Sequence, residues 1–179
     1  MTFYHIDRDK TLKTGTVMPH VITNYSISKI FSDVYEHGLH YLFHNEQDTR
    51  SVLCEWILEY VRVTLFPKMP SRFKCLFATK SRDEAIVWAQ YWNRQDYNLV
   101  EIEADTYIEL DCSWFTDSRK ICIPNDSPYL LPTSVDLSST AILFEKAVKY
   151  WSGQRSDIPR LEVLIPYPCQ VKNIYRPND

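Results

Sequence analysis

Glu162 stands at the start of an apolar run, Val163–Ile165, near the end of the chain. A continuous aliphatic run is typical of a strand covered on both faces. An isolated carboxylate there is costly, so it must be paired, reach solvent or line a cleft. A carboxylate in a cleft can hold a hydroxyl group, accept a proton and favour a developing positive charge. The residues alone leave open whether Glu162 is paired, reaches solvent or lines a cleft.

Polar residues gather at two further places. His5 is followed by Asp7 and Arg8 on a short β-prone segment, where a hydrogen-bonded histidine and a surface ion pair are the ordinary interpretation. Arg72 precedes a segment with apolar alternation, and arginine is the preferred side chain for bidentate phosphate binding. The alternative is that Arg72 pairs with Glu55 or Glu59. We interpret Glu55, Glu59 and the nearby Arg62 as residues that form structural ion pairs on one helix.

Three histidines, His37, His40 and His44, share one face if their segment is helical, and that spacing could hold a metal ion. No glutamate follows His40 in the zinc-protease pattern. We interpret the three as a polar helix face.

The chain has only 3 glycines. None belongs to a P-loop or to the glycine-rich turn of a dinucleotide-binding fold, both of which need glycine for close approach to phosphate. The G-x-S-x-G pattern of α/β-hydrolases is also absent. A nucleotide, if bound, must be held in another way.

The composition is that of an ordinary globular protein, with 45% hydrophobic and 24% charged residues among 179. We expect a single domain over residues 1–179. The net charge of −3 gives no overall attraction to nucleic acid, although a local basic groove is compatible with it. No apolar run approaches the roughly 20 residues that cross a bilayer, and the N-terminus lacks the shape of a signal peptide. The dispersed cysteines favour reduced thiols, so we expect a cytoplasmic protein without membrane contact.

These residues must be positioned by a mixed set of elements, which predicts an α+β fold. Strands are expected at residues 2–7, 71–80, 97–104, 106–112 and 160–175, and helices at residues 28–44, 45–67, 81–93 and 138–151. Residues 16–26 are expected to form a loop or a short strand, and residues 112–136 to be mostly loop. Ser81 and Glu84 have the spacing of a capping box at the start of the third helix.

Taken in order, four segments resemble the ADP-ribosyltransferase-like superfamily, and most closely a bacterial branch of it. They are "FYHIDRDKTLKTG" near the N-terminus, "CEWILEYVRVTLFPKMPSRFKCLFAT", "AVKYWSG" at a helix end, and "LEVLIPYPCQVKNIY". The last is similar to the final catalytic strand of members that modify DNA and RNA. The resemblance covers nearly the whole chain and rests on the order of the segments, not on one motif.

The resemblance implies a split β-sheet core with three or four helices that binds NAD in a cleft without a glycine loop. It implies that Glu162 is the catalytic glutamate, that His5 binds an NAD ribose, and that Arg8 or Arg72 meets the pyrophosphate. An aromatic side chain would stack on nicotinamide, and the candidates are Phe73, Phe77 and Tyr91.

Members that modify arginine commonly carry a second acid two residues before the catalytic glutamate, where this chain has Arg160. The resemblance therefore favours nucleic acid, RNA or DNA, over protein as the acceptor. It implies a toxin or anti-phage effector, with an antitoxin or chaperone as a further partner. The segment Ser113–Asp136 is expected to face the acceptor, because long irregular segments often carry function.

Two other functions stay open. One is a non-catalytic module that binds protein or nucleic acid, in which Glu162 pairs with Arg8, Arg72 or another cation. The other is a nuclease or hydrolase that uses His5, Asp7 and Glu162.

Overall fold

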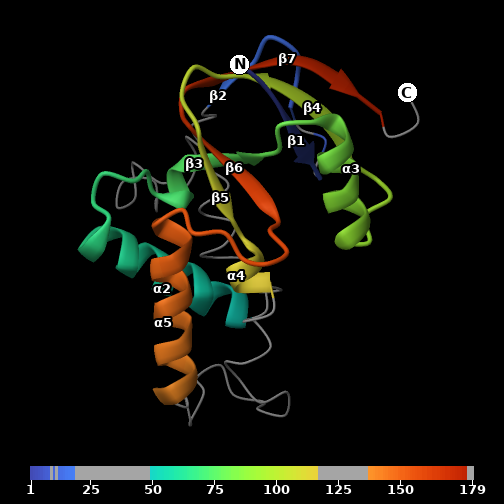
Figure 1. The fold of residues 1–179 in the computed structure, drawn as a ribbon. Helices are drawn as coiled ribbons and strands as arrows, with labels where there is room; N and C mark the ends of the chain where they lie inside the picture. The colour runs from blue at the N-terminus through green and yellow to red at the C-terminus, as the bar shows by residue number, and fades with distance from the viewer. Residues whose placement is uncertain (9, 11, 19–48, 117–136, 177–179) are drawn as a thin grey trace. The chain divides into compact units, whose positions relative to one another are not determined.

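The computed structural model describes residues 1–8, 10, 12–18, 49–116 and 137–176, without the side chains of residues 18, 49–53, 116 and 137–140 (Figure 1). These residues form two compact units. Unit 1 takes the described residues within 1–18, 73–109 and 162–176, and unit 2 those within 49–72, 110–116 and 137–161. Each unit is assembled from separate stretches of the chain.

Unit 1 contains a four-stranded antiparallel sheet in the order β1-β4-β7-β2. Its strands are β1 (Thr2–Asp7), β4 (Asn98–Glu103), β7 (Cys169–Tyr175) and β2 (Val17–Met18). Phe3 lies opposite Ile102, and both are fully buried, so the apolar alternation predicted for β1 and β4 faces a core. The short strand β2 falls within the segment for which the sequence left a loop or a strand open.

A second sheet has the order β3-β6-β5, formed by β3 (Cys75–Ala78), β6 (Leu161–Pro166) and β5 (Ile108–Asp111). β3 and β6 are antiparallel, with Phe77 opposite Leu164. Within unit 1, side chains from both sheets share one core, which includes Phe3, Leu76, Ala78, Val100, Ile102, Val163, Ile165 and Val171. Residues 163–165 are all buried, which confirms that this run is covered on both faces.

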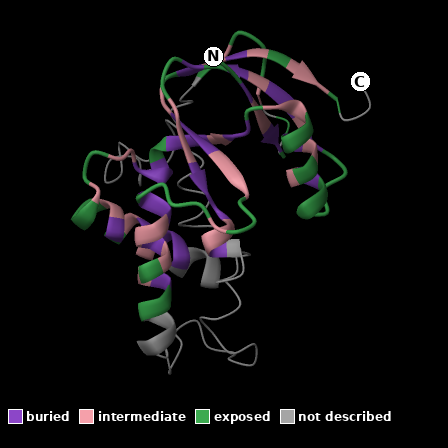
Figure 2. Cartoon of the chain, in the orientation of Figure 1, coloured by how far each residue is buried: buried purple, intermediate pink, exposed green. Residues whose placement is uncertain are grey.

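Helix α3 (Arg82–Tyr91) packs on β1 through Ala85 and Ala89. Its N-terminus carries the predicted capping box, in which Glu84 N–H donates to Ser81 Oγ and Ser81 N–H donates to the Glu84 carboxylate. Small residues on the inner face let the helix approach the strand closely, while the outer face is exposed (Figure 2).

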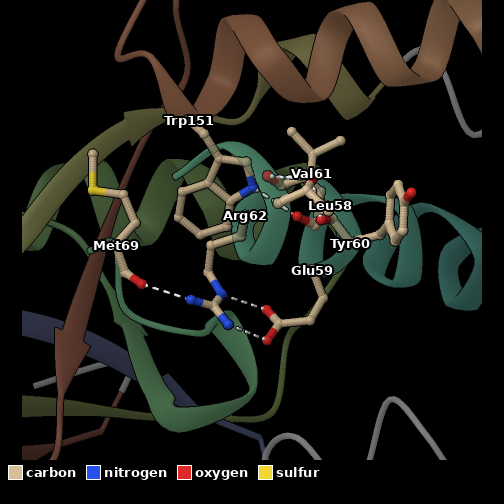
Figure 3. Close-up of polar contacts among 8 residues, drawn as sticks. Leu58, Glu59, Tyr60, Val61, Arg62, Met69 and Trp151 are labelled. Carbon is tan, nitrogen blue, oxygen red and sulfur yellow. Dashed lines mark hydrogen bonds and ion pairs between the residues drawn. The ribbon is translucent and has the colours of Figure 1, made fainter. Parts of the chain in front are cut away.

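Unit 2 contains α2 (Thr49–Leu65), α4 (Ser113–Thr116) and α5 (Leu137–Trp151). α2 packs against α5, where Cys54 and Leu143 are buried beside Ile57. Figure 3 shows the indole N–H of Trp151, which donates to the Leu58 carbonyl oxygen at 2.8 Å.

The end of α2 is held by Arg62. Its guanidinium donates to both carboxylate oxygens of Glu59, at 3.0 and 2.8 Å, and to the Met69 carbonyl oxygen at 2.9 Å (Figure 3). This confirms the predicted Glu59–Arg62 pair and shows a further role, because Arg62 also fastens the proline-flanked turn that follows the helix.

The expected elements differ from the structure at three places. The single strand expected over residues 160–175 is two strands, β6 and β7, which belong to different sheets and are separated by Tyr167 and Pro168. A short helix, α4, lies within the segment expected to be mostly loop. The helix expected over residues 28–44, and most of Ser113–Asp136, lie outside the described residues.

The α+β class is confirmed by these helices and the two small antiparallel sheets. In the part of the chain that the structure describes, no helix combines the length and the apolar character needed to cross a membrane.

Candidate active site

The end of β3 lies beside β1 in unit 1. Tyr4 and Thr79 form an isolated antiparallel bridge, with Tyr4 N–H donating to Thr79 O at 2.9 Å and Thr79 N–H donating to Tyr4 O at 2.8 Å. Next to this bridge, His5 Nδ1 lies 2.7 Å from the Phe77 carbonyl oxygen. The junction between the two sheets therefore falls at His5.

The Phe77 contact fixes the tautomer of the neutral His5 ring. A carbonyl oxygen only accepts hydrogen bonds, so Nδ1 carries the hydrogen, and Nε2 of the neutral ring keeps its lone pair. Burial lowers the pKa of His5. The bond to Phe77 and the charge of Asp7 oppose this shift, and the charge of Arg8 adds to it. His5 is therefore neutral at neutral pH and offers Nε2 as an acceptor for an O–H group.

Glu162 lies on β6, the strand that pairs with β3. Their register sets Phe77 opposite Leu164 and Ala78 opposite Val163, and Thr79 and Glu162 are the residues that come next to this last pair on the two segments. Glu162 is partly buried, and by alternation it faces away from the core that Val163 enters.

Thr79 lies between these two segments. It bridges to Tyr4, the neighbour of His5, and it follows Ala78, the last residue of β3 that pairs with β6. Three neighbouring strands of unit 1 therefore place the backbones of His5 and Glu162 near the same end of β3.

A cation lies at the same end of β3. Lys80 Nζ is 2.5 Å from a carboxylate oxygen of Glu109 on β5 and 5.6 Å from the centre of the Tyr107 ring. Glu109 is the more shielded partner, with 18% of its side chain exposed against 44% for Lys80. The positive charge of Lys80 is therefore already balanced by Glu109.

The three candidate aromatic residues lie in different surroundings. Phe77 is partly buried and, by alternation, shares the face of Thr79 and Glu162. Phe73 is buried in the 3₁₀ turn Arg72–Lys74, and Tyr91 lies exposed at the end of α3. Of the three, Phe77 is the one with a contact to His5, which it makes through its backbone carbonyl oxygen.

Arg8 follows β1 directly and is exposed. Its guanidinium carbon lies 5.5 Å from the centre of the Trp92 ring, at the C-terminal end of α3. An exposed guanidinium close to His5 in sequence remains available to a phosphate, because such a group can stack through its face and bind through its edge.

Arg72 has a different role from the one implied by the resemblance. It belongs to unit 2, is buried, and donates to both Glu55 carboxylate oxygens at 2.8 and 2.9 Å. Its remaining terminal nitrogen donates to the Tyr150 hydroxyl at 2.5 Å. The alternative interpretation, a pair with a helix carboxylate, is confirmed. We therefore leave Arg72 out of the candidate site, because its donors are directed at these partners.

Two residues that the sequence did not indicate have defined roles. One is Thr79, described above. The other is Asp111, which is fully buried and accepts hydrogen bonds from Ser113 N–H at 3.0 Å, Ser156 N–H at 2.7 Å and Arg160 N–H at 3.0 Å, as well as from the Ser113 hydroxyl. Asp111 thus joins the start of α4 to the residues just before β6.

The electrostatics of Asp111 follow from these contacts. Burial raises the pKa of its carboxyl, but the hydrogen bonds from Ser113 and Ser156 stabilise the carboxylate more strongly, and the net pKa is lowered. An aspartate two residues before a serine is a familiar local cap, so that contact could have been inferred from the sequence. The contacts with Ser156 and Arg160 are distant in sequence and left no signal.

No site for a metal ion is evident where the structure is described. Across these ranges, no group of three or more His, Cys, Asp or Glu side chains is placed to hold one. The histidines for which the sequence offered that alternative, His37, His40 and His44, lie outside the described residues.

Two comparisons with known proteins were informative. No curated protein matches the chain. Residues 22–177 match the family described as "Protein of unknown function (DUF2441)". Because this match spans most of the chain, the protein belongs to the DUF2441 family.

Proposed function

We propose that this protein is an NAD-dependent ADP-ribosyltransferase that transfers ADP-ribose to a macromolecule, with nucleic acid favoured over protein as the acceptor. One observation carries the proposal. His5, which burial keeps neutral and whose Nδ1–H donates to the Phe77 carbonyl oxygen at 2.7 Å, lies at the same end of β3 as Glu162. A fixed acceptor for a ribose hydroxyl and a carboxylate on a nearby strand are what cleavage of a nicotinamide–ribose bond requires.

In the proposed reaction, the bond between nicotinamide and ribose C1′ breaks and its electron pair leaves with nicotinamide. The ribose passes through a state that resembles an oxocarbenium ion, as in glycoside cleavage. Glu162 would stabilise this positive charge and accept the proton of the incoming nucleophile as the new bond to C1′ forms. Nicotinamide is neutral when it leaves, so the reaction needs no second acid.

The other groups have subsidiary roles in this proposal. His5 Nε2 would accept a hydrogen bond from a ribose hydroxyl, and Phe77 would stack on nicotinamide. Arg8 would contact the pyrophosphate, because it is exposed and follows the strand that carries His5. The scarcity of glycine fits this arrangement, since side chains and not a glycine loop would hold the nucleotide.

The test is to incubate the purified protein with NAD labelled in its adenylate half, together with RNA, single-stranded DNA, duplex DNA or a cell lysate. Wild-type protein should transfer label to one acceptor class, and Glu162→Gln should not. Glu103→Gln is the matched control, because Glu103 is an exposed carboxylate of unit 1 that pairs with Lys172. Equal transfer by wild type and Glu162→Gln would remove Glu162 from the mechanism.

A second function, a binding module without catalysis, predicts neither NAD cleavage nor NAD binding. Release of nicotinamide from NAD without any acceptor distinguishes the two, because water can replace the acceptor in a competent site.

A further inference from the structure

The outer surface of α3 carries a cluster of aromatic rings, which we call the α3 platform: Trp88, Tyr91 and Trp92, with Arg8 stacked on it. The ring centres of Trp88 and Trp92 are 5.0 Å apart, and those of Trp88 and Tyr91 are 5.8 Å apart. Arg8 lies 5.5 Å from the Trp92 ring centre. All four residues belong to unit 1.

The platform is exposed at its rim and anchored at its centre. Trp92 and Tyr91 expose 41% and 50% of their surface, whereas Trp88 packs against the core formed by Ile6, Ala85, Ala89, Tyr97 and Leu99. A helix that only covered a strand would be expected to place polar residues on its outer face. Large aromatic rings left in water on a supported surface are characteristic of a binding surface.

The chemistry of the platform fits single-stranded nucleic acid. Unpaired bases stack on aromatic rings and on guanidinium planes, and sequence hardly matters because every base has a π-face. Arg94, which is exposed and follows Trp92 closely in the sequence, provides a cation for the phosphates, and Arg8 adds positive charge where it stacks on Trp92. The nearby carboxylate of Asp96 is already paired with Lys10. A surface for a partner helix would instead present several aliphatic side chains at helical spacing. On α3 the exposed large aliphatic residue is Val87, so this pattern is not formed.

We propose that the α3 platform binds single-stranded nucleic acid, with bases stacked on Tyr91 and Trp92 and a phosphate held by Arg94. The consequence for catalysis rests on the proposed function: Arg8 follows the strand of His5, so the platform would bring the acceptor strand to the side of the candidate site. The binding itself requires neither NAD nor Glu162.

Binding is measured by fluorescence anisotropy of labelled single-stranded RNA and DNA oligonucleotides without NAD. Wild-type protein should bind one or both oligonucleotides. The comparison of RNA with DNA shows whether the ribose or the deoxyribose strand is preferred. Trp92→Ala and Tyr91→Ala should each weaken binding by about fivefold to about a hundredfold, and Trp92→Phe, which keeps a ring, should recover much of the loss. Trp56→Ala is the matched control, because Trp56 is a tryptophan of unit 2 that is 50% exposed.

Thermal unfolding of each variant shows whether a loss of binding reflects a loss of fold. Absence of binding to both oligonucleotides by wild type, or equal binding by wild type and folded Trp92→Ala, would overturn the proposal. The proposal would also be overturned if the wild type self-associates and Trp92→Ala does not. In that case the α3 platform would bind a second copy of the chain. Glu162→Gln should bind oligonucleotide normally, and NAD cleavage without acceptor tests the proposed function independently.

Discussion

His5 donates through Nδ1 to the Phe77 carbonyl oxygen, 2.7 Å away, and this contact joins β1 to β3 next to the bridge between Tyr4 and Thr79. The bond does two things at once. It holds the two strands together, and it leaves Nε2 as the ring nitrogen able to accept a hydrogen bond. Substitutions at His5 can therefore test the structural role of Nδ1 and the proposed binding role of Nε2 separately.

His5→Asn keeps a side-chain N–H that can donate to Phe77 but removes the acceptor that Nε2 provides. One uncharged hydrogen bond contributes about 1 kcal/mol, so the KM for NAD should rise about fivefold if Nε2 binds a ribose hydroxyl. His5→Ala should raise KM similarly and also lower the melting temperature, because the bond to Phe77 is lost. Nicotinamide release measured over a range of NAD concentrations gives KM. An unchanged KM in a folded His5→Asn variant would show that Nε2 does not contact NAD.

The lowered pKa of His5 predicts that stability falls on acidification. In the unfolded chain this histidine titrates near pH 6.5, and in the folded protein it titrates lower. Between the two values the unfolded state binds more protons, so the free energy of unfolding decreases as pH falls from about 6.5 through the folded pKa. Denaturant titrations over this range should show a loss for wild type that is smaller for His5→Asn. Parallel curves would mean that other groups cause the loss.

Glu162→Gln separates catalysis from structure through stability. A catalytic carboxylate is often kept at a cost in stability, so its replacement should leave the melting temperature unchanged or raise it, while activity falls about a hundredfold or more. If Glu162 serves instead as a buried ion-pair partner, the same change should destabilise the protein by roughly 3–5 kcal/mol. Differential scanning calorimetry of wild type, Glu162→Gln and Glu103→Gln distinguishes these outcomes.

Much of the fold could be inferred from local patterns. Alternation in residues 2–7 and 97–104 and the capping box at Ser81 are local signals, and the structure confirms the strands and the helix. The split of residues 160–175 between two sheets was missed, because both strands are apolar and nothing in their composition assigns them to different partners. The role of Asp111 was missed for the same reason, since its partners Ser156 and Arg160 are distant in sequence.

The candidate site shows the same limit. Residue chemistry drew attention to Glu162 and Arg72, and the resemblance added His5, but only the strand pairing shows that His5 and Glu162 lie near the same end of β3. For Arg72, the sequence offered both a phosphate and a carboxylate as partner. The choice depended on the three-dimensional placement of Glu55 and Tyr150.

Arg72 should behave as a structural residue. Arg72→Met would leave the Glu55 carboxylate buried without its principal cation, which should destabilise the protein by roughly 3–5 kcal/mol. Adding Glu55→Leu should restore part of the lost free energy of unfolding, because the buried charge is then removed as well. Lys149→Met is the control for a more exposed pair of unit 2, with Glu145, and should leave the free energy of unfolding almost unchanged. Urea unfolding measures all four proteins. If Arg72→Met instead loses affinity for NAD while its stability is unchanged, Arg72 contacts the pyrophosphate of NAD.

Asp111→Asn should weaken the junction between α4 and β6. The amide that replaces one carboxylate oxygen donates where the protein supplies N–H and O–H donors, so at least one of the backbone donors of Ser113, Ser156 or Arg160 loses its acceptor. A buried donor left without an acceptor costs about 1–3 kcal/mol. Urea unfolding should show this loss of stability, and hydrogen exchange should become faster first at the amides of Ser156 and Arg160. Glu101→Gln is the control, because Glu101 is a partly exposed carboxylate that accepts hydrogen bonds from Tyr175 and Asn173. Uniformly faster exchange across unit 2, without priority at these two amides, would show that Asp111 contributes to general stability and does not hold this junction in particular.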